Sequence, residues 1–157
     1  MKKFELTTNT KMLFGRKLFR IKALVSFGDV TAGDLGGYVE KEGNLSHDGN
    51  AWVYDNAWVY GNAQVYGNAW VYDNAWVCGD AQVYGNADYL CFKGLGSQNR
   101  NTTFFKCKDG HIHVSCGCFR GNLAEFEAKV KETHGDSKYG KEYLACLEVV
   151  KIHFEEE

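Results

Sequence analysis

The feature that most constrains this chain is a six-residue repeat that begins at Ala51. Six consecutive hexapeptides read Ala, then Trp or Gln, then Val, then Tyr in five of six copies, then a Gly- or Asp-led turn pair. The better period is eighteen: residues 51–68 and 69–86 differ only at Tyr60/Cys78 and Asn62/Asp80, so 16 of 18 positions are identical. Collagen and coiled coils have other periods. The repeat therefore predicts a β-solenoid in which three hexapeptides make one coil.

Within each hexapeptide, alternation places the small Ala and the branched Val on the inner face of a flat side. The residue between them points outward. The Gly-Asn or Asp-Asn pair then turns the corner, since these residues tolerate left-handed backbone angles. Glycine is abundant (18 residues) and proline is absent, which favours regular turns over linkers. The eighteen-residue return is expected to stack three outward pairs about 4.8 Å apart: Trp52 over Trp70, Trp58 over Trp76, and Gln64 over Gln82.

The solenoid is expected to begin near Gly36, because Val39 and Leu45 share the inward phase of Ala51. Residues 36–90 then make about three coils, which is near the minimum for a stable solenoid. Both ends of a solenoid expose strand edges, so the flanking segments are expected to act as caps. We predict three domains: an N-terminal β cap at 1–35, the repeat at 36–90, and a C-terminal α+β domain at 91–157.

The flanks carry ordinary strand and helix signals. Residues 17–24 alternate like a half-buried strand, and Gly15 can turn this strand against residues 10–14. Residues 104–108 and 111–115 predict a hairpin with a two-residue Asp109-Gly110 turn. Asn122 followed by Glu125 predicts a helix start, with the helix ending near Gly135. A second helix is expected from about residue 138, although residues 149–154 also suit a strand.

Charge and hydropathy limit the function classes. The net charge of −2 is uneven: residues 1–35 carry seven Lys/Arg and three Asp/Glu (+4), whereas residues 36–90 carry one and seven (−6). An acidic middle disfavours binding of a nucleic-acid polymer. No stretch approaches the roughly 18 apolar residues of a membrane helix, and no apolar run follows the N-terminal lysines. We expect a cytoplasmic protein whose six cysteines are thiols.

The first candidate site is a set of cations on the predicted hairpin. The two-residue turn places Lys106 opposite His113 and Lys108 opposite His111, which puts all four on one face. Together with two arginines nearby in sequence, Arg100 and Arg120, this face could hold a phosphate or another anion. The alternative is a solvated strand face. In this register Cys107 points away from both histidines, so we predict neither a metal site nor any catalytic residue or cofactor.

The second candidate site is the pair of tryptophan stacks formed by Trp52, Trp58, Trp70 and Trp76. Four exposed tryptophans would make large apolar patches, which soluble monomers avoid. The patches should be covered by another subunit, by the flanking segments, or by a flat aromatic ligand such as a base. His47 holds an inward phase usually taken by Val, which favours a role in capping over one in catalysis.

The hexapeptide array resembles the left-handed parallel β-helix of the hexapeptide-repeat proteins, best known as acyltransferases. The implied fold is mainly β: a short three-sided left-handed parallel β-helix of about three coils, with an N-terminal β cap and a small α+β C-terminal domain. Acyltransferases of this superfamily use a histidine near the coils between subunits. Residues 51–90 contain none, so an acyltransferase-like enzyme is the least favoured function.

A wider resemblance is to small phage and prophage hexapeptide-repeat proteins. In the N-terminal part of the chain, the resemblance rests on residues 19–24, 27–30, 33–37 and 42–46. In the C-terminal part, called the tail here, it rests on residues 116–121, 125–126, 133–136 and 142–143. The tail resembles a module found on several phage proteins. This implies a phage-encoded, non-catalytic binding protein in the host bacterial cytoplasm. We expect a homo-oligomer, dimer or trimer, that counters defence by sequestering a small nucleotide or anionic signal or by blocking a host protein; the alternative is a structural module without ligand.

Overall fold

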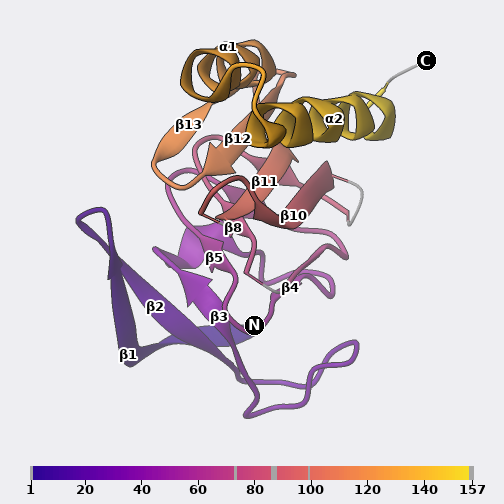
Figure 1. Ribbon diagram of the computed structural model, residues 1–157. Helices are drawn as coiled ribbons and strands as arrows, with labels where there is room; N and C mark the ends of the chain where they lie inside the picture. Colours follow the sequence, from indigo (N-terminus) through magenta and orange to yellow (C-terminus); the bar gives the residue numbers. More distant parts are fainter. Residues whose placement is uncertain (1, 73, 86–87, 99, 156–157) are drawn as a thin grey trace. The chain divides into compact units, whose positions relative to one another are not determined.

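The computed structural model describes residues 2–72, 74–85, 88–98 and 100–155 (Figure 1). The chain is mainly β and divides into two compact units, Met1–Asn86 and Ala87–Glu157. Neither of the two helices in the described part has the length and apolar character that a bilayer crossing requires. Each unit has its own sheets and its own buried side chains, and each is described by itself.

The repeat forms short parallel strands at the predicted spacing. Each hexapeptide contributes a two-residue strand, and strands eighteen residues apart pair in parallel. As expected, Trp52 pairs with Trp70, Trp58 with Trp76, and Gln64 with Gln82. The six strands are β4 (Trp52–Val53), β5 (Trp58–Val59), β6 (Gln64–Val65), β7 (Trp70–Val71), β8 (Trp76–Val77) and β9 (Gln82–Val83).

The inward phase of the repeat is confirmed. Every Ala and Val of the six hexapeptides is at most 1% exposed, from Ala51 to Val83. The corners adopt left-handed backbone, with φ of 68° at Gly61, 65° at Gly67 and 64° at Gly79, and of 52° at Asp55. These are the angles that glycine and aspartate adopt at least cost. The repeat thus alternates buried Ala-x-Val sides with left-handed corners.

In the coil that precedes the repeat, the predicted positions still face inward, but the coil is two residues longer than a coil of the repeat. Val39 and Leu45 are buried, as predicted, and pair with Val59 and Val65. The offset is 59 − 39 = 20 residues, two more than in the repeat. The extra length includes a single 3₁₀ turn, η1 (Glu42–Asn44). Parallel pairing of β3 (Leu35–Val39) with β5 joins this coil to the repeat.

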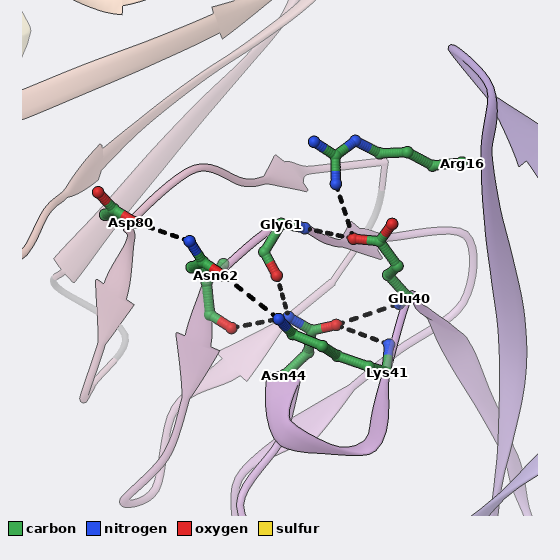
Figure 2. Close-up of polar contacts among 8 residues, drawn as sticks. Arg16, Glu40, Lys41, Asn44, Gly61, Asn62 and Asp80 are labelled. Atoms are coloured by element: carbon green, nitrogen blue, oxygen red, sulfur yellow. Dashed lines mark hydrogen bonds and ion pairs between the residues drawn. The ribbon is translucent and has the colours of Figure 1, made fainter.

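The buried amide of Asn44 fills the irregular corner of this first coil (Figure 2). Its Oδ1 accepts hydrogen bonds from the backbone N–H groups of Glu40 (3.1 Å) and Lys41 (2.9 Å). Its Nδ2 donates to the carbonyls of Gly61 (3.2 Å) and Ala63 (2.8 Å) in the next coil. Asn44 is 0% exposed. One side chain therefore bonds four backbone groups at the corner that contains the two-residue insertion, and it ties that corner to the next coil.

The N-terminal segment forms the predicted hairpin. Strands β1 (Phe4–Leu13) and β2 (Arg16–Ala23) are antiparallel and meet at Phe14 and Gly15. Because β2 pairs with β3, the hairpin extends one sheet of the repeat in the order β1-β2-β3-β5-β8. Basic side chains of the hairpin reach the repeat: Arg16 bonds Glu40 (2.8 Å), and Lys11 lies over the Tyr38 ring.

The C-terminal unit is a four-stranded antiparallel sheet with two helices packed on it (Figure 1). Its buried core includes Phe104, Val114, Phe126, Tyr143 and Leu147. The elements are β10 (Tyr89–Leu95), β11 (Arg100–Lys106), β12 (Ile112–Cys116), β13 (Phe119–Asn122), α1 (Leu123–His134) and α2 (Lys138–His153).

The helix predictions hold. Asn122 is the N-cap of α1, and its amide and the Glu125 carboxylate form the reciprocal capping box. Gly135 follows the last residue of α1. Residues 149–153 belong to α2, so the strand alternative for this segment is wrong. Burial of Leu147 and Val150 on one side of the helix explains why this segment is helical and not a strand.

The predicted register of the 104–115 hairpin is wrong by one residue. Phe105 pairs with His113, and Lys106 pairs with Ile112. Cys107 N–H donates to His111 O, so the turn has three residues, and Gly110 takes φ of 84°. The same Asp-Gly pair suits a two-residue turn and a three-residue turn with a left-handed glycine. A one-residue slip moves each side chain to the opposite face.

We expect the change Asn44→Ala to lower the free energy of unfolding of the N-terminal unit by about 2–4 kcal/mol, because it leaves buried backbone groups without partners. Urea unfolding followed by tryptophan fluorescence measures this unit selectively, since all four tryptophans lie in it. The control Asn9→Ala removes an exposed amide and should shift stability by less than about 0.5 kcal/mol. Equal midpoints for the two variants would contradict the role of Asn44.

Candidate functional site

The C-terminal unit contains a pocket of about 370 Å³ whose lining mixes cations, thiols and aromatic rings. It lies where the β12–β13 turn, the start of β11 and both helices meet. Most of its side chains come from residues 116–121, 125–126, 133–136 and 142–143. The lining residues are Arg100, Cys116, Cys118, Phe119, Phe126, Lys129, Val130, Thr133, His134 and Tyr143.

The tight turn between β12 and β13 shapes one wall. Cys116 pairs with Phe119, which leaves Gly117 and Cys118 in the turn. Arg120 donates from Nη1 to the carbonyls of Gly117 (2.7 Å) and Phe119 (2.6 Å) and so supports the turn from within. A Cβ at position 117 would overlap the Arg100 guanidinium. Because residue 117 is glycine, the Arg100 guanidinium can pack against the turn.

Helix α1 supplies the second wall through one face. Its lining residues Phe126, Lys129, Val130, Thr133 and His134 follow the spacing i, i+3, i+4, i+7 and i+8. Phe126 and Val130 are buried in the core, which turns this face inward. Lys129 and His134 lie at the edge of the same face. The buried stripe of the helix thus decides which polar side chains reach the pocket.

Tyr143 of α2 forms a further wall of the pocket, and its uncharged hydroxyl makes hydrogen bonds there. Its hydroxyl donates to Leu95 O (3.3 Å) and lies 3.7 Å from Cys116 Sγ. Its ring stacks on His134 with centroids 5.7 Å apart and meets Phe126 edge-on at 5.6 Å. Burial raises the pKa of Tyr143 above its usual range, and Cys116 acts in the same direction. The phenol therefore keeps its proton at neutral pH.

The charge of the pocket has one sign. Arg100 and Lys129 are cationic, and among the described residues that line the pocket none is Asp or Glu. The ion pair that Lys129 makes is a long contact of 4.0 Å to Glu132, on the exposed side of α1. A pocket whose described lining holds two cations and no carboxylate favours an anionic occupant.

The structure separates the cations that the hairpin prediction had grouped. Lys106 shares a face with Ile112, and His113 shares the other with Phe105, so the four-cation face does not form. Lys106 lies 3.5 Å from Asp88, and His113 Nε2 lies 2.9 Å from Asp109. Lys108 and His111 are exposed at the turn. Of the six cations predicted for ligand binding, Arg100 alone lines the pocket.

Both predicted tryptophan pairs are in register, ring stacking is seen for Trp58 and Trp76, and the N-terminal segment contacts both pairs. Trp58 and Trp76 stack with centroids 4.7 Å apart and planes 10° apart. Phe14 meets Trp76 edge-on at 6.4 Å. Trp52 is 1% exposed, with Phe4 at 6.4 Å and Phe27 at 5.3 Å, so a ligand cannot reach it. Trp58, Trp70 and Trp76 remain partly exposed.

The thiols and histidines do not gather into a metal centre. All six cysteines are free, and no group of three or more His, Cys, Asp or Glu within 2–72, 74–85, 88–98 and 100–155 could hold a metal ion. The register places Cys107 on the face of His111 and His113, so the sequence argument that it points away from them was wrong. His47 instead stacks on Phe4 at 4.4 Å and accepts a hydrogen bond from Lys3 N–H.

Sequence reasoning missed Lys129, Thr133, His134 and the wall formed by Tyr143. The sequence does contain a relevant pattern, because Lys129, Thr133 and His134 follow Phe126 at helical spacing within a segment predicted to be helical. This pattern predicts a pocket only if the turn at 116–119 is known to lie against the same helix face. The pocket is a property of the packed unit.

Comparison with protein-family models gives one match. Residues 63–79 match the family described as YdcK Beta solenoid repeat. The match lies within the hexapeptide array and supports a β-solenoid repeat there. No curated protein matches the chain in sequence.

Alkaline pH should destabilise the C-terminal unit. Burial raises the pKa of the Cys146 thiol from 9.0 to about 12, and its neighbours Cys116 and Glu142 act in the same direction. Above pH 9 the unfolded chain loses this proton while the folded unit keeps it, so stability falls between about pH 9 and 12. Urea unfolding followed by circular dichroism at 222 nm monitors this unit, which holds both described helices.

The fall in the urea midpoint from pH 8 to pH 10.5 should shrink in Cys146→Ala. It should persist in the matched variant Cys118→Ala, which removes an exposed thiol from the same unit. Identical falls in both variants would show that the buried Cys146 thiol does not cause the effect.

Proposed function

We propose that this protein is a non-catalytic binding protein that captures a small anionic ligand with a flat aromatic part, of the nucleotide class, in the C-terminal pocket. The observation that carries the proposal is the combination of Arg100 and Lys129 with aromatic walls and no carboxylate in the described part of the lining. A guanidinium and an ammonium match the oxygens of a phosphate, and aromatic rings match a base. The volume lies within the usual range for small-molecule sites.

The arrangement of the rings supports a flat ligand. The ring centroids of Phe119 and Phe126 are 5.4 Å apart, and those of Phe126 and Tyr143 are 5.6 Å apart. Phe119 is partly exposed, whereas Phe126 and Tyr143 are buried. The pocket therefore has an accessible ring at its rim and a fixed aromatic floor. A base that stacks on Phe119 would place its phosphate among the cations.

Binding is favoured over catalysis by what the lining offers. A nucleophilic thiol needs a base and a group that orients the base. Here His134 stacks on the Tyr143 ring, and within the lining that the structure describes no carboxylate is present to orient its imidazole. The pocket therefore suits capture of a ligand better than its turnover.

The resemblance to small phage proteins supports the biological setting of the proposal. The tail segments that carry this resemblance supply most of the pocket lining. We place the protein in the cytoplasm of a bacterial host, encoded by a phage or prophage, where sequestering a nucleotide signal would counter defence. For the repeat we propose a left-handed, three-sided helix of about three coils, supported by the eighteen-residue register and three sets of parallel strands.

The second candidate function is assembly of a homo-oligomer without ligand. It is favoured by the stacked pair Trp58 and Trp76, which stays partly exposed on the repeat. Partly exposed aromatic stacks suit burial against a second copy. Native mass spectrometry of freshly purified protein separates the two functions, because it reports the subunit count and any retained small molecule together.

We expect adenosine monophosphate and adenosine triphosphate to bind with measurable heat in isothermal titration calorimetry. The double variant Arg100→Gln/Lys129→Gln should raise Kd at least about tenfold for each charge removed, since hydrogen bonds to charged groups contribute about 1.5–3 kcal/mol. The matched variant Lys93→Gln/Lys141→Gln removes two exposed cations of the same unit outside the pocket and should bind as the natural chain does.

Two results would overturn the ligand proposal. One is the absence of any small-molecule adduct in native spectra together with no heat from either nucleotide or from inorganic phosphate. The other is equal weakening of nucleotide binding in both double variants, which would indicate a general charge effect and no defined site.

A further inference from the structure

The rings that line the C-terminal pocket differ in how far a ligand can reach them. Phe126 and Tyr143 are buried, and the imidazole of His134 is stacked on Tyr143. Phe119 is partly exposed at the rim. A Cβ at Gly121 would meet Phe119 Cζ at 2.9 Å, so the glycine leaves room for this ring. Phe119 is therefore the phenyl ring of the described lining on which a flat base can stack.

The two cations of the lining set the charge that a ligand has to supply. Among the described residues Arg100 makes no ion pair, and Lys129 makes the 4.0 Å contact with Glu132. Burial raises the pKa of Tyr143, and the charge of Arg100 opposes this rise, which places the guanidinium close to the phenol. A phosphate monoester carries about −1.5 to −2 charges at neutral pH and so balances both cations. A phosphate diester brings a single negative charge.

The described lining also lacks the oxygen ligands that a nucleotide-bound magnesium ion uses. Nucleoside triphosphates bring Mg²⁺, which proteins ligate through one or two carboxylates besides the phosphates. Glu142 precedes Tyr143 in α2, but it accepts a hydrogen bond from Gly96 N–H at 2.7 Å and does not line the pocket. Glu132 lies on the exposed side of α1. The described lining therefore suits a ligand that arrives without a divalent cation.

We propose that the ligand is a nucleoside monophosphate, with its base stacked on Phe119 and its terminal phosphate monoester held by Arg100 and Lys129, bound without a divalent cation. This inference rests on the proposed nucleotide function and narrows it to one class of nucleotide. The volume of about 370 Å³ lies near the lower end of the range for small-molecule sites. In the described lining, the second base of a dinucleotide would find no further exposed phenyl ring, and additional phosphates would find no further Lys or Arg.

The test is isothermal titration calorimetry of the full chain with four adenine ligands: adenosine monophosphate, 3′,5′-cyclic adenosine monophosphate, adenosine triphosphate with Mg²⁺, and the dinucleotide adenylyl-adenosine. We expect adenosine monophosphate to bind most tightly. The cyclic nucleotide keeps the base and the sugar but carries a diester, so its Kd should be about tenfold higher, because one charge-assisted contact is lost. Addition of a chelator should change the Kd of adenosine monophosphate less than about twofold, since no divalent cation takes part.

Two ring variants test the position of the base. Phe119→Ala should raise the Kd of adenosine monophosphate about five- to tenfold, because base stacking is lost. It should change the Kd of inorganic phosphate, which has no base, less than about twofold. The matched control Tyr139→Ala removes a ring that is 37% exposed on the same unit but does not line the pocket. It should leave both constants unchanged, and circular dichroism at 222 nm checks that both variants fold.

The outcomes separate this inference from the nucleotide function on which it rests. Tighter binding of the triphosphate with Mg²⁺, of the dinucleotide or of the cyclic nucleotide would overturn the monophosphate inference and leave nucleotide capture standing. Equal loss of binding in Phe119→Ala and Tyr139→Ala would overturn the placement of the base in the same way. Absence of heat from all four ligands and from inorganic phosphate would overturn both.

Discussion

The N-terminal unit depends on one constraint, the burial of an Ala-x-Val pair on each side of every coil. These residues are at most 1% exposed throughout the repeat, and each Val lies on the Val eighteen residues later. Alanine keeps each side narrow enough to be followed at once by a corner, and valine fills the interior between rungs. A shift of one residue would exchange buried and exposed positions along the whole array. The eighteen-residue register therefore fixes every outward side chain.

That register is also what creates candidate binding surfaces on the repeat. An outward residue placed once in the eighteen-residue unit recurs one rung away, so a single Tyr or Gln becomes a ladder. The Trp58–Trp76 stack and the Tyr66–Tyr84 pair arise in the same way. Their surroundings differ. The N-terminal hairpin lies beside the tryptophans through Lys11 and Phe14, whereas Tyr84 on another side is 62% exposed.

The C-terminal unit builds its pocket by a different principle, the convergence of segments that are distant in sequence. A turn held by Arg120 presents Cys118 and Phe119, and the buried stripe of α1 brings Lys129 and His134 to the same place. Tyr143 fixes the floor through its bonds to Leu95 O and Cys116 Sγ. The pocket of the C-terminal unit thus combines cationic and aromatic side chains, whereas the outward pairs of the repeat combine aromatic and amide side chains.

By itself the sequence determined the repeat, its phase, the Trp and Gln pairs, the N-terminal hairpin and both helix starts, because each follows from local periodicity or from a cap within a few residues. Only the tertiary structure decided the register at Asp109-Gly110, since that dipeptide fits turns of two lengths and packing chooses between them. It also decided that Phe4 and Phe27 pack against the buried Trp52. Arg100 and Lys129 line one pocket, whereas Lys106 and His113 lie on opposite faces of their hairpin. Contacts between segments far apart in sequence depend on how the elements pack, and no local pattern encodes that packing.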